Sequence, residues 1–256
     1  MTEENNGDGD NRTKIYFFYM IIILMFVEIL DTYTTNYPNV IPSKIIEEFL
    51  SNYPENVATS IYMLCGAIAT VGMYFVFLNQ FMADKAGRKL LLGITVLGMG
   101  VSSLLLALST NIIQYTIFLF LLYMFFSSDI WVIYINEECT PEKRAFWTNI
   151  VLIGGVTGAL LIPVFRSIYI TETGSNWRGM TYFAIILGIV LSIIVLSTFK
   201  ETSKYLEIKE EKLAIDESRN LLIENIKTLF TSEHKNEFKI ILIISFVAGL
   251  NYIFIH

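Results

Sequence analysis

Cysteine and histidine are scarce in this sequence, and their scarcity narrows the kinds of site it can build. The 256 residues include two cysteines, Cys65 and Cys139, and two histidines, His234 and His256. The cysteines lie in or beside different apolar segments, so they give neither metal-ligand spacing nor a disulfide framework. No histidine cluster or Ser/His pair lies near the apolar segments, which argues against a membrane-embedded enzyme. We therefore expect no metal site, no cofactor and no covalent chemistry.

Charged residues are also few, and the negative balance excludes a further class of partner. Only 16% of the residues are charged and 54% are hydrophobic, whereas soluble domains are about a quarter charged. The net charge of −6 argues against nucleic acid as a partner. No A-x-A-like cleavage site follows the acidic start MTEENNGDGD, so the first apolar segment is interpreted as a membrane helix rather than a signal peptide.

The apolar residues are gathered into long segments, and most of these segments are long enough to cross a bilayer as helices, which takes about 20 residues. Strands of a membrane barrel would alternate apolar and polar residues, and these segments do not. The sequence therefore predicts an all-α polytopic membrane protein. The apolar segments lie near residues 15–30, 57–82, 90–108, 112–135, 146–165, 180–199 and 238–255.

The distribution of lysine and arginine predicts the orientation. If the N-terminus is inside, the short inside segments carry seven Lys and Arg and the outside segments carry three. Basic residues favour the cytoplasmic side, so we expect a cytoplasmic N-terminus in the cell membrane and a sixth helix that ends inside.

The succession of inside and outside segments divides the chain into four parts. Residues 1–14 are expected to be a disordered cytoplasmic tail, and residues 15–199 a six-helix bundle. Residues 200–237 would be a cytoplasmic central loop, either with interfacial helices or as a partly ordered solvated linker. Residues 238–256 would begin a seventh membrane helix. Because this apolar segment stops at His256 with no polar tail, we expect a truncated sequence.

The stretch FMADKAGRKL, residues 81–90, places charges where helix dipoles disfavour them. Asp84 falls at the C-terminal end of the second expected helix, and Arg88 and Lys89 fall at the start of the third. Helix dipoles favour the opposite arrangement. Gly87 can adopt the left-handed conformation that ends one helix and turns into the next. We therefore expect these charges to contact other elements.

The stretch YINEECTPEKRAFW repeats the order of acid before base at a second inside turn. Its charged residues are Glu137, Glu138, Lys143 and Arg144. Two such turns could pair crosswise, Asp84 with Arg144 and Glu138 with Arg88. The alternative is a pair of solvated loops that obey the positive-inside rule.

Four stretches resemble the Major Facilitator Superfamily of transporters. DKAGRK resembles the family signature between helices two and three, with glutamine at Gln80 where the family has glycine. EECTPEKRA resembles the turn between helices four and five, and NWRGMTYF resembles the entry to helix six. KETSKYL resembles the segment after helix six in sugar porters and organic-ion transporters. The residues that match the signature are Asp84, Lys85, Gly87, Arg88 and Lys89.

The resemblance implies the N-terminal half of a twelve-helix transporter, with the central loop and the start of helix seven. It implies alternating access to a small solute such as a sugar or organic ion, by symport or facilitated uptake, with protons as a possible partner. The bundle would work in a lipid bilayer with a second, missing C-terminal half. The implied cytoplasmic gate consists of Asp84, Lys85, Gly87, Arg88, Lys89, Glu138 and Arg144.

Charges inside the apolar segments are the candidates for binding. Glu28 and Asp31 lie three residues apart, on one face of the first helix, and Asp129 falls near the middle of the fourth. Pro38 and Pro42 can break the first helix after them. Structural hydrogen bonding is the alternative role for these carboxylates.

In the resembling families, helices one and four line the central cavity. Thr34 stands where sugar porters carry a proton-coupling carboxylate, so that role is either absent here or moved to Asp31 or Glu28. The candidate substrate- or proton-binding residues are Glu28, Asp31, Thr34, Asn36 and Asp129.

Small residues in the fifth helix, Gly154, Gly155 and Gly158, are interpreted as a close-packing surface. The alternative to a transporter is a sensor or a seven-helix receptor on the same scaffold. A complete receptor would normally have an outside N-terminus and a hydrophilic tail after helix seven, and this sequence shows neither.

Overall fold

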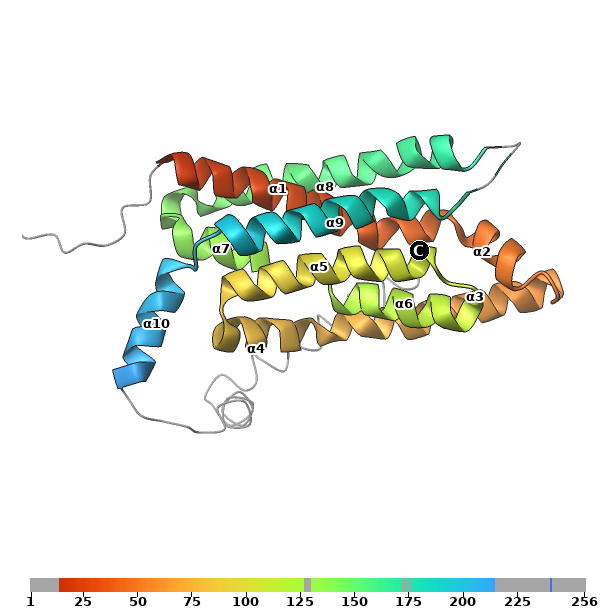
Figure 1. The fold of residues 1–256 in the computed structure, drawn as a ribbon, viewed down its shortest axis with the longest axis horizontal. Helices are drawn as coiled ribbons and strands as arrows, with labels where there is room; N and C mark the ends of the chain where they lie inside the picture. The colour runs from red at the N-terminus through yellow and green to blue at the C-terminus, as the bar shows by residue number, and fades with distance from the viewer. Residues whose placement is uncertain (1–13, 127–129, 172–173, 175, 215–239, 241–256) are drawn as a thin grey trace, which may run out of the picture. The chain divides into compact units, whose positions relative to one another are not determined.

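The computed structural model describes residues 14–126, 130–171, 174, 176–214 and 240. The long helices between residues 14 and 198 run side by side (Figure 1). Residues 1–207 form one compact unit, and residues 208–256 form a second that is described only in small part. The elements are α1 Lys14–Asn36, η1 Tyr37–Val40, α2 Pro42–Phe49, α3 Glu55–Thr70, η2 Val71–Phe75, α4 Val76–Ala86, α5 Arg88–Ala107, α6 Ile112–Met124, α7 Ile130–Glu138, α8 Pro141–Tyr169, α9 Gly179–Thr198 and α10 Ser203–Ala214.

The expected all-α membrane fold is confirmed. In the part of the chain that the structure describes, five helical stretches are long and apolar enough to cross a membrane: α1 with η1, α3 with η2, α5, α8 and α9. The expected second helix is continuous from α3 through η2 to α4. The expected fourth helix is covered by α6 and α7, which lie on either side of residues 127–129. Except for Ile240, the expected seventh helix lies outside the described residues.

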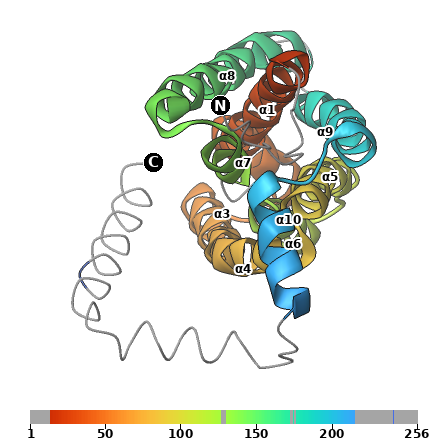
Figure 2. The same ribbon diagram turned by 90° about the vertical axis from the view of Figure 1, so that its left-hand side faces the viewer.

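Two helix pairs make the most extensive contacts among the described helices. α1 lies against α8, and α5 lies against α9, as the end-on view shows (Figure 2). Gly154 and Gly158 on α8 face the backbone carbonyls of Met25 and Ile29 on α1. Lipid tails are as apolar as leucine, so membrane helices gain stability from close packing, which small residues permit. The predicted role of these glycines in packing is confirmed.

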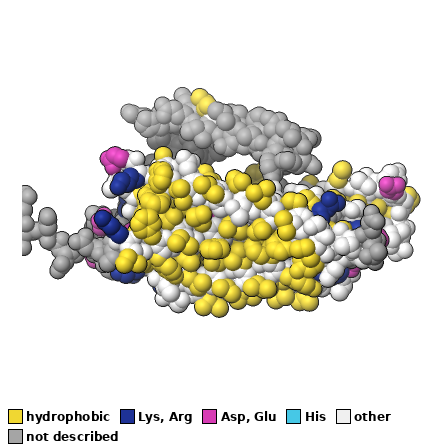
Figure 3. All heavy atoms as spheres, turned by 90° about the horizontal axis from the view of Figure 1, so that it is seen from above, with side chains coloured by type: hydrophobic (Ala, Val, Ile, Leu, Met, Phe, Trp, Pro, Cys, Tyr) yellow, Lys and Arg dark blue, Asp and Glu magenta, His cyan; other side chains and the backbone are white. Residues whose placement is uncertain are grey.

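The outer surface of the bundle is apolar along its middle and charged at its ends. A band of hydrophobic side chains covers the face seen in Figure 3, and Lys, Arg, Asp and Glu gather toward the two ends. Exposed apolar residues such as Ile22, Val156 and Ile186 contribute to such surfaces. In water this surface would be unfavourable, and in a bilayer it contacts acyl chains.

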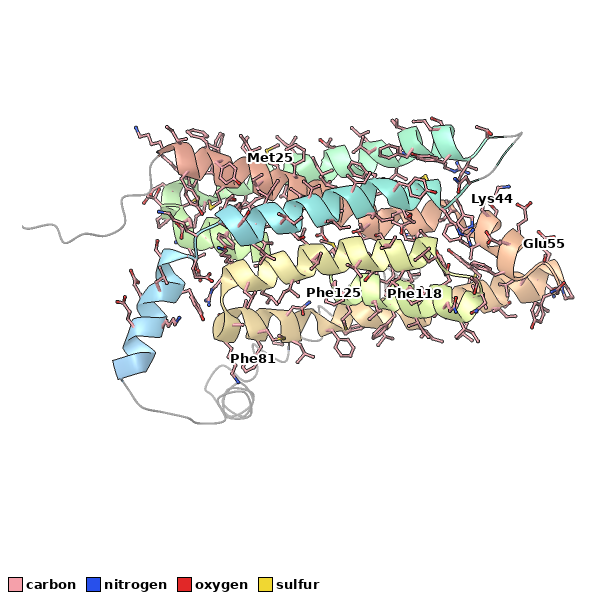
Figure 4. All side chains as sticks on the ribbon, in the orientation of Figure 1. Met25, Lys44, Glu55, Phe81, Phe118 and Phe125 are labelled. Carbon is pink, nitrogen blue, oxygen red and sulfur yellow. The ribbon has the colours of Figure 1, made fainter. Side chains whose placement is uncertain are left out.

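The two ends of the bundle hold different connections. The charged end, defined by the α4–α5 turn, the α7–α8 turn and residues 200–205, also holds the start of α1 (Figure 1). The opposite end holds α2 and the connection from α8 to α9, and Lys44 and Glu55 mark it in Figure 4. Pro38 and Pro42 lie in the first turns of η1 and α2, so the chain turns after Asn36 at the opposite end.

Candidate functional site

Glu28 and Asp31 lie on the interior side of α1. Glu28 is 8% exposed and Asp31 is 4% exposed, although the helix around them is strongly apolar. Both residues have interaction partners. Burying a carboxylate at membrane depth is costly, and such residues commonly serve binding or ion coupling.

A glycine on the neighbouring helix makes room for one of these carboxylates. Thr32 donates its hydroxyl to Oε1 of Glu28 at 3.4 Å. A Cβ atom at Gly155 of α8 would lie 2.8 Å from that same oxygen and 2.9 Å from the Thr32 hydroxyl. Gly155 therefore accommodates a polar pair, whereas Gly154 and Gly158 allow backbone contact.

Two further candidates of α1 are hydrogen-bonded within the helix. The Thr34 hydroxyl donates to the backbone oxygen of Asp31 at 3.0 Å and contacts the sulfur of Met99 at 3.5 Å. The Asn36 side chain donates to the backbone oxygen of Thr32 at 2.8 Å. The structure thus brings Glu28, Asp31 and Thr34 to the buried side of one helix. Asp129 lies outside the described residues.

At the charged end, Arg88 joins two turns. Its Nη2 atom lies 2.8 Å from Oδ1 of Asp84 and 3.2 Å from Oε1 of Glu137, and its Nη1 atom donates to the backbone oxygen of Ala83. The Arg88–Glu137 pair is shielded from water because both side chains are nearly buried, whereas Asp84 is mostly exposed. The second turn thus supplies Glu137 to Arg88, and the hypothesis that it supplies Glu138 is wrong.

The predicted pairing of Asp84 with Arg144 is also wrong. Among the described residues no ion pair joins Asp84 to Arg144, because Asp84 forms its ion pair with Arg88 of its own turn. Arg144 instead donates its Nε–H to the backbone oxygen of Cys139, 3.2 Å away, at the end of α7. Sequence order suggested a symmetric exchange, but the turn at Gly87 between α4 and α5 brings the Arg88 guanidinium back to Asp84 and the end of α4.

Glu201, which the sequence analysis missed, caps α5 from outside the helix. Its carboxylate accepts the backbone N–H groups of Arg88 at 2.9 Å and of Lys89 at 3.1 Å. These are N–H groups of the first turn of α5, which have no partner within the helix. The negative charge compensates both the helix dipole and the basic residues that begin it. Its signal in the sequence was an acid directly after the sixth expected helix.

A second capping contact works in the same way. Glu138 at the end of α7 accepts the backbone N–H of Ser203, the first residue of α10, at 2.9 Å. Tyr205 of α10 lies with its ring 5.0 Å from the Arg88 guanidinium and donates its hydroxyl to the backbone oxygen of Lys85 at 3.3 Å. The segment after α9 therefore connects both turns. It contacts five of the expected gate residues: Lys85, Gly87, Arg88, Lys89 and Glu138.

The opposite end has its own arginine centre. Arg178, before α9, forms an ion pair with Glu48 of α2 at 2.7 Å and donates to the backbone oxygens of Ala107 and Ser109 at 2.9 and 2.8 Å. The Trp177 indole also donates to Glu48. The hydrogen bond from Arg178 holds the pKa of Glu48 below its ordinary value, aided by the Trp177 hydrogen bond and opposed by partial burial.

A bundle of apolar helices with buried carboxylates in its first helix and charged turns at one end defines a polytopic α-helical membrane protein. The chain belongs to the Major Facilitator Superfamily, whose family model matches residues 15–256. The resemblance to the N-terminal half of this family, seen in its motifs, is confirmed. A search of curated proteins found no match.

Several solved structures share the fold. A D-xylose-proton symporter has a TM-score of 0.63 at 17% identity, covering 82% of this chain and 55% of the symporter. The inward-open xylose transporter XylE from E. coli has a TM-score of 0.64 at 17% identity, covering 85% of this chain and 57% of that protein. This chain thus spans about half the length of those structures. At such identity the likeness establishes the fold.

Proposed function

We propose that this protein is a secondary transporter for a small solute, a sugar or an organic ion, and that it works by alternating access. Its bundle would rock against a second bundle of similar size about a site near the middle of the membrane. The xylose symporters that share the fold support a sugar as the first substrate to test. In this proposal the protein lies in the cell membrane and its charged end faces the cytoplasm, because basic residues favour that side.

The buried carboxylates of α1 carry the proposal. Two acidic side chains three residues apart are kept in an apolar helix, and α8 has a glycine where a larger residue would displace one of them. Packing alone does not require Glu28 or Asp31, since apolar residues would fill the same space at lower cost. Binding of a polar solute or a proton does require such groups.

The charged end supplies the conformational part of the proposal. Its ion pair and capping contacts join turns from α4 through α10 and would hold one state of the cycle. Movement of the bundles would need these contacts to break together, and several modest interactions broken at once give a two-state element. Asp84, Lys85, Gly87, Arg88, Lys89, Glu138 and Arg144 remain the proposed gate, with Glu137 and Glu201 added.

Uptake by the full-length protein in sealed vesicles tests the proposal. Radiolabelled D-xylose is the first probe, followed by other sugars and organic ions, at several external pH values. Asp31→Asn should lower uptake at least about tenfold, equivalent to about 1.4 kcal/mol, and flatten its pH dependence. Glu28→Gln should do the same if protons are carried by that residue.

The matched control is Glu47→Gln, a carboxylate that is mostly exposed on α2 and pairs with Lys44. This variant should transport like the wild type. Unchanged uptake and unchanged pH dependence in both α1 variants would exclude them from coupling. Absence of uptake of every solute by the folded wild-type protein would overturn the transport function itself.

A further inference from the structure

A cavity of about 460 Å³ lies at the charged end, between the first turns of α1 and the α7–α8 turn. Its polar lining includes Lys14, Lys143, Glu138 and Thr140, and its apolar lining includes Phe18 and Trp147. This volume is in the range of pockets that bind small ligands. Neither the buried carboxylates of α1 nor Arg88 lines it, and it shares Glu138 with the proposed gate.

The two lysines make this cavity attractive to an anion. They come from different helices, and within the part of the chain that the structure describes neither forms an ion pair. Glu138 contributes the one negative charge of the lining, and its carboxylate already accepts the N–H of Ser203. The balance of the lining therefore remains positive.

The aromatic wall indicates where this cavity sits in a membrane. The Trp147 ring makes edge contacts with Phe17 and Phe18, with ring centres 5.1 and 5.6 Å apart. Tryptophan and other amphipathic aromatic residues gather at the level of lipid headgroups. Below this level Phe18, Ile22 and Phe26 recur every four residues on the exposed side of α1, giving an apolar path toward the membrane centre.

We propose that this cavity binds the headgroup of an anionic phospholipid. Its phosphate would lie between Lys14 and Lys143, and an acyl chain would follow the exposed apolar face of α1. Basic pockets between membrane helices suit anionic headgroups, and the continuous apolar path distinguishes a lipid from a free anion. The proposal is independent of whether the protein transports a solute.

Lipid binding by the full-length, delipidated protein tests the proposal. Native mass spectrometry would measure the apparent affinity for phosphatidylglycerol and for phosphatidylcholine of the same chain length. The wild type should bind phosphatidylglycerol more tightly. The double variant Lys14→Gln/Lys143→Gln should lose about 25-fold in that affinity, about fivefold for each lysine, with phosphatidylcholine unaffected.

Two further variants distinguish binding in the cavity from a general effect of surface charge. Lys204→Gln on α10 removes an exposed lysine that does not line the cavity and should leave the affinity unchanged. Lys14→Arg/Lys143→Arg keeps both charges and should retain most of the binding. If the double glutamine variant does not fold, Lys143→Gln alone should show the fivefold loss.

Three results would overturn the proposal. The wild type could bind both lipids equally, or the double variant could keep its affinity for phosphatidylglycerol. Alternatively, inorganic phosphate could compete with phosphatidylglycerol at equal concentration, which would make this a site for a free anion rather than for a lipid.

Discussion

Arg88 and Lys89 begin α5 with two positive charges, at the end of a helix where the dipole is already positive. The start of the helix is nevertheless stabilised, because its first two N–H groups donate to the carboxylate of Glu201, a residue of the segment after α9. A residue that is unfavourable in its own helix therefore creates the need for a partner from another element. This makes Glu201 a structural connection between helices that are distant in sequence.

Replacing Glu201 should loosen this connection. Glu201→Ala removes the acceptor of two backbone N–H groups and should lower the free energy of unfolding by about 1–2 kcal/mol. The melting temperature of the purified protein measures this loss. Glu207→Ala, an exposed acid on α10, is the matched control and should have little effect. Equal melting temperatures for the two variants would contradict the capping role.

Gly87 is the residue at which the backbone requires glycine. Its φ is 108°, and a Cβ atom there would also meet the carboxylate of Glu201. Gly87→Ala should therefore destabilise the protein by about 1–2 kcal/mol, through backbone strain and a weakened cap. Gly66→Ala in α3, where a Cβ atom meets nothing within 4 Å, should be neutral or slightly stabilising in the same thermal assay. If Gly87→Ala melts no lower than Gly66→Ala, the strain argument fails.

At the scale of elements, the contact of α1 with α8 fixes where the buried carboxylates lie. Gly154 and Gly158 bring the backbones together, and Gly155 between them leaves space for Glu28. Three glycines within five residues thus perform two tasks on one helix face. The sequence indicated close packing but gave no sign that Gly155 differs from its neighbours, since that depends on which residue of α1 lies opposite.

A larger residue at Gly158 should separate these helices. Gly158→Val would place atoms against the backbone oxygen of Ile29 and should cost about 1–3 kcal/mol through overpacking. Ala159→Val, at the exposed neighbouring position, adds an apolar side chain without this conflict and serves as the control. Thermal unfolding in detergent and uptake in vesicles should both fall for Gly158→Val alone. A Gly158→Val protein that behaves like Ala159→Val would show that the helices adjust without cost.

The second membrane helix shows where a tertiary contact changes an element. The sequence predicts one apolar helix near residues 57–82, whereas α3 passes into η2 before α4 begins. η2 lies against α6, and a Cβ atom at Gly72 would meet the backbone of Phe120 and Met124. The tighter helix coincides with this close approach, which single-chain periodicity cannot reveal.

For the whole bundle, the two ends are held by different arginines. Arg88 joins the turns of the charged end, and Arg178 joins α2 to the α5–α6 connection and the start of α9. The Glu48–Arg178 pair is partly exposed, so water screens it more than the Arg88–Glu137 pair. The lowered pKa of Glu48 predicts that the stability of the opposite end depends on pH.

Acid should weaken the opposite end through Glu48. Because the pKa of Glu48 is lowered in the folded protein, its stabilising contribution is present above the ordinary value of 4.5 and is lost as pH falls through the lowered value. The melting-temperature difference between wild type and Glu48→Gln should thus be constant near neutral pH and narrow below about pH 4.5. Its size should correspond to less than about 1 kcal/mol.

Glu47→Gln is the control, since Glu47 pairs only locally with Lys44 of its own helix. Its difference from the wild type should be small throughout the titration. A difference for Glu48→Gln that stays constant into strong acid, or widens there, would mean that Glu48 does not stabilise this end in its charged form.

The sequence by itself determined the fold class, the positions of most membrane helices and the family, because hydrophobic length and local turn motifs are properties of contiguous residues. It also identified Glu28 and Asp31, since charge in an apolar helix is visible without a structure. The tertiary structure alone decided that Arg88 forms an ion pair with Glu137, that Glu201 caps α5, and that Gly155 faces Glu28. These contacts join residues far apart in the chain, and which partner is reached depends on helix rotation and on the path of the connecting segments, neither of which local periodicity encodes.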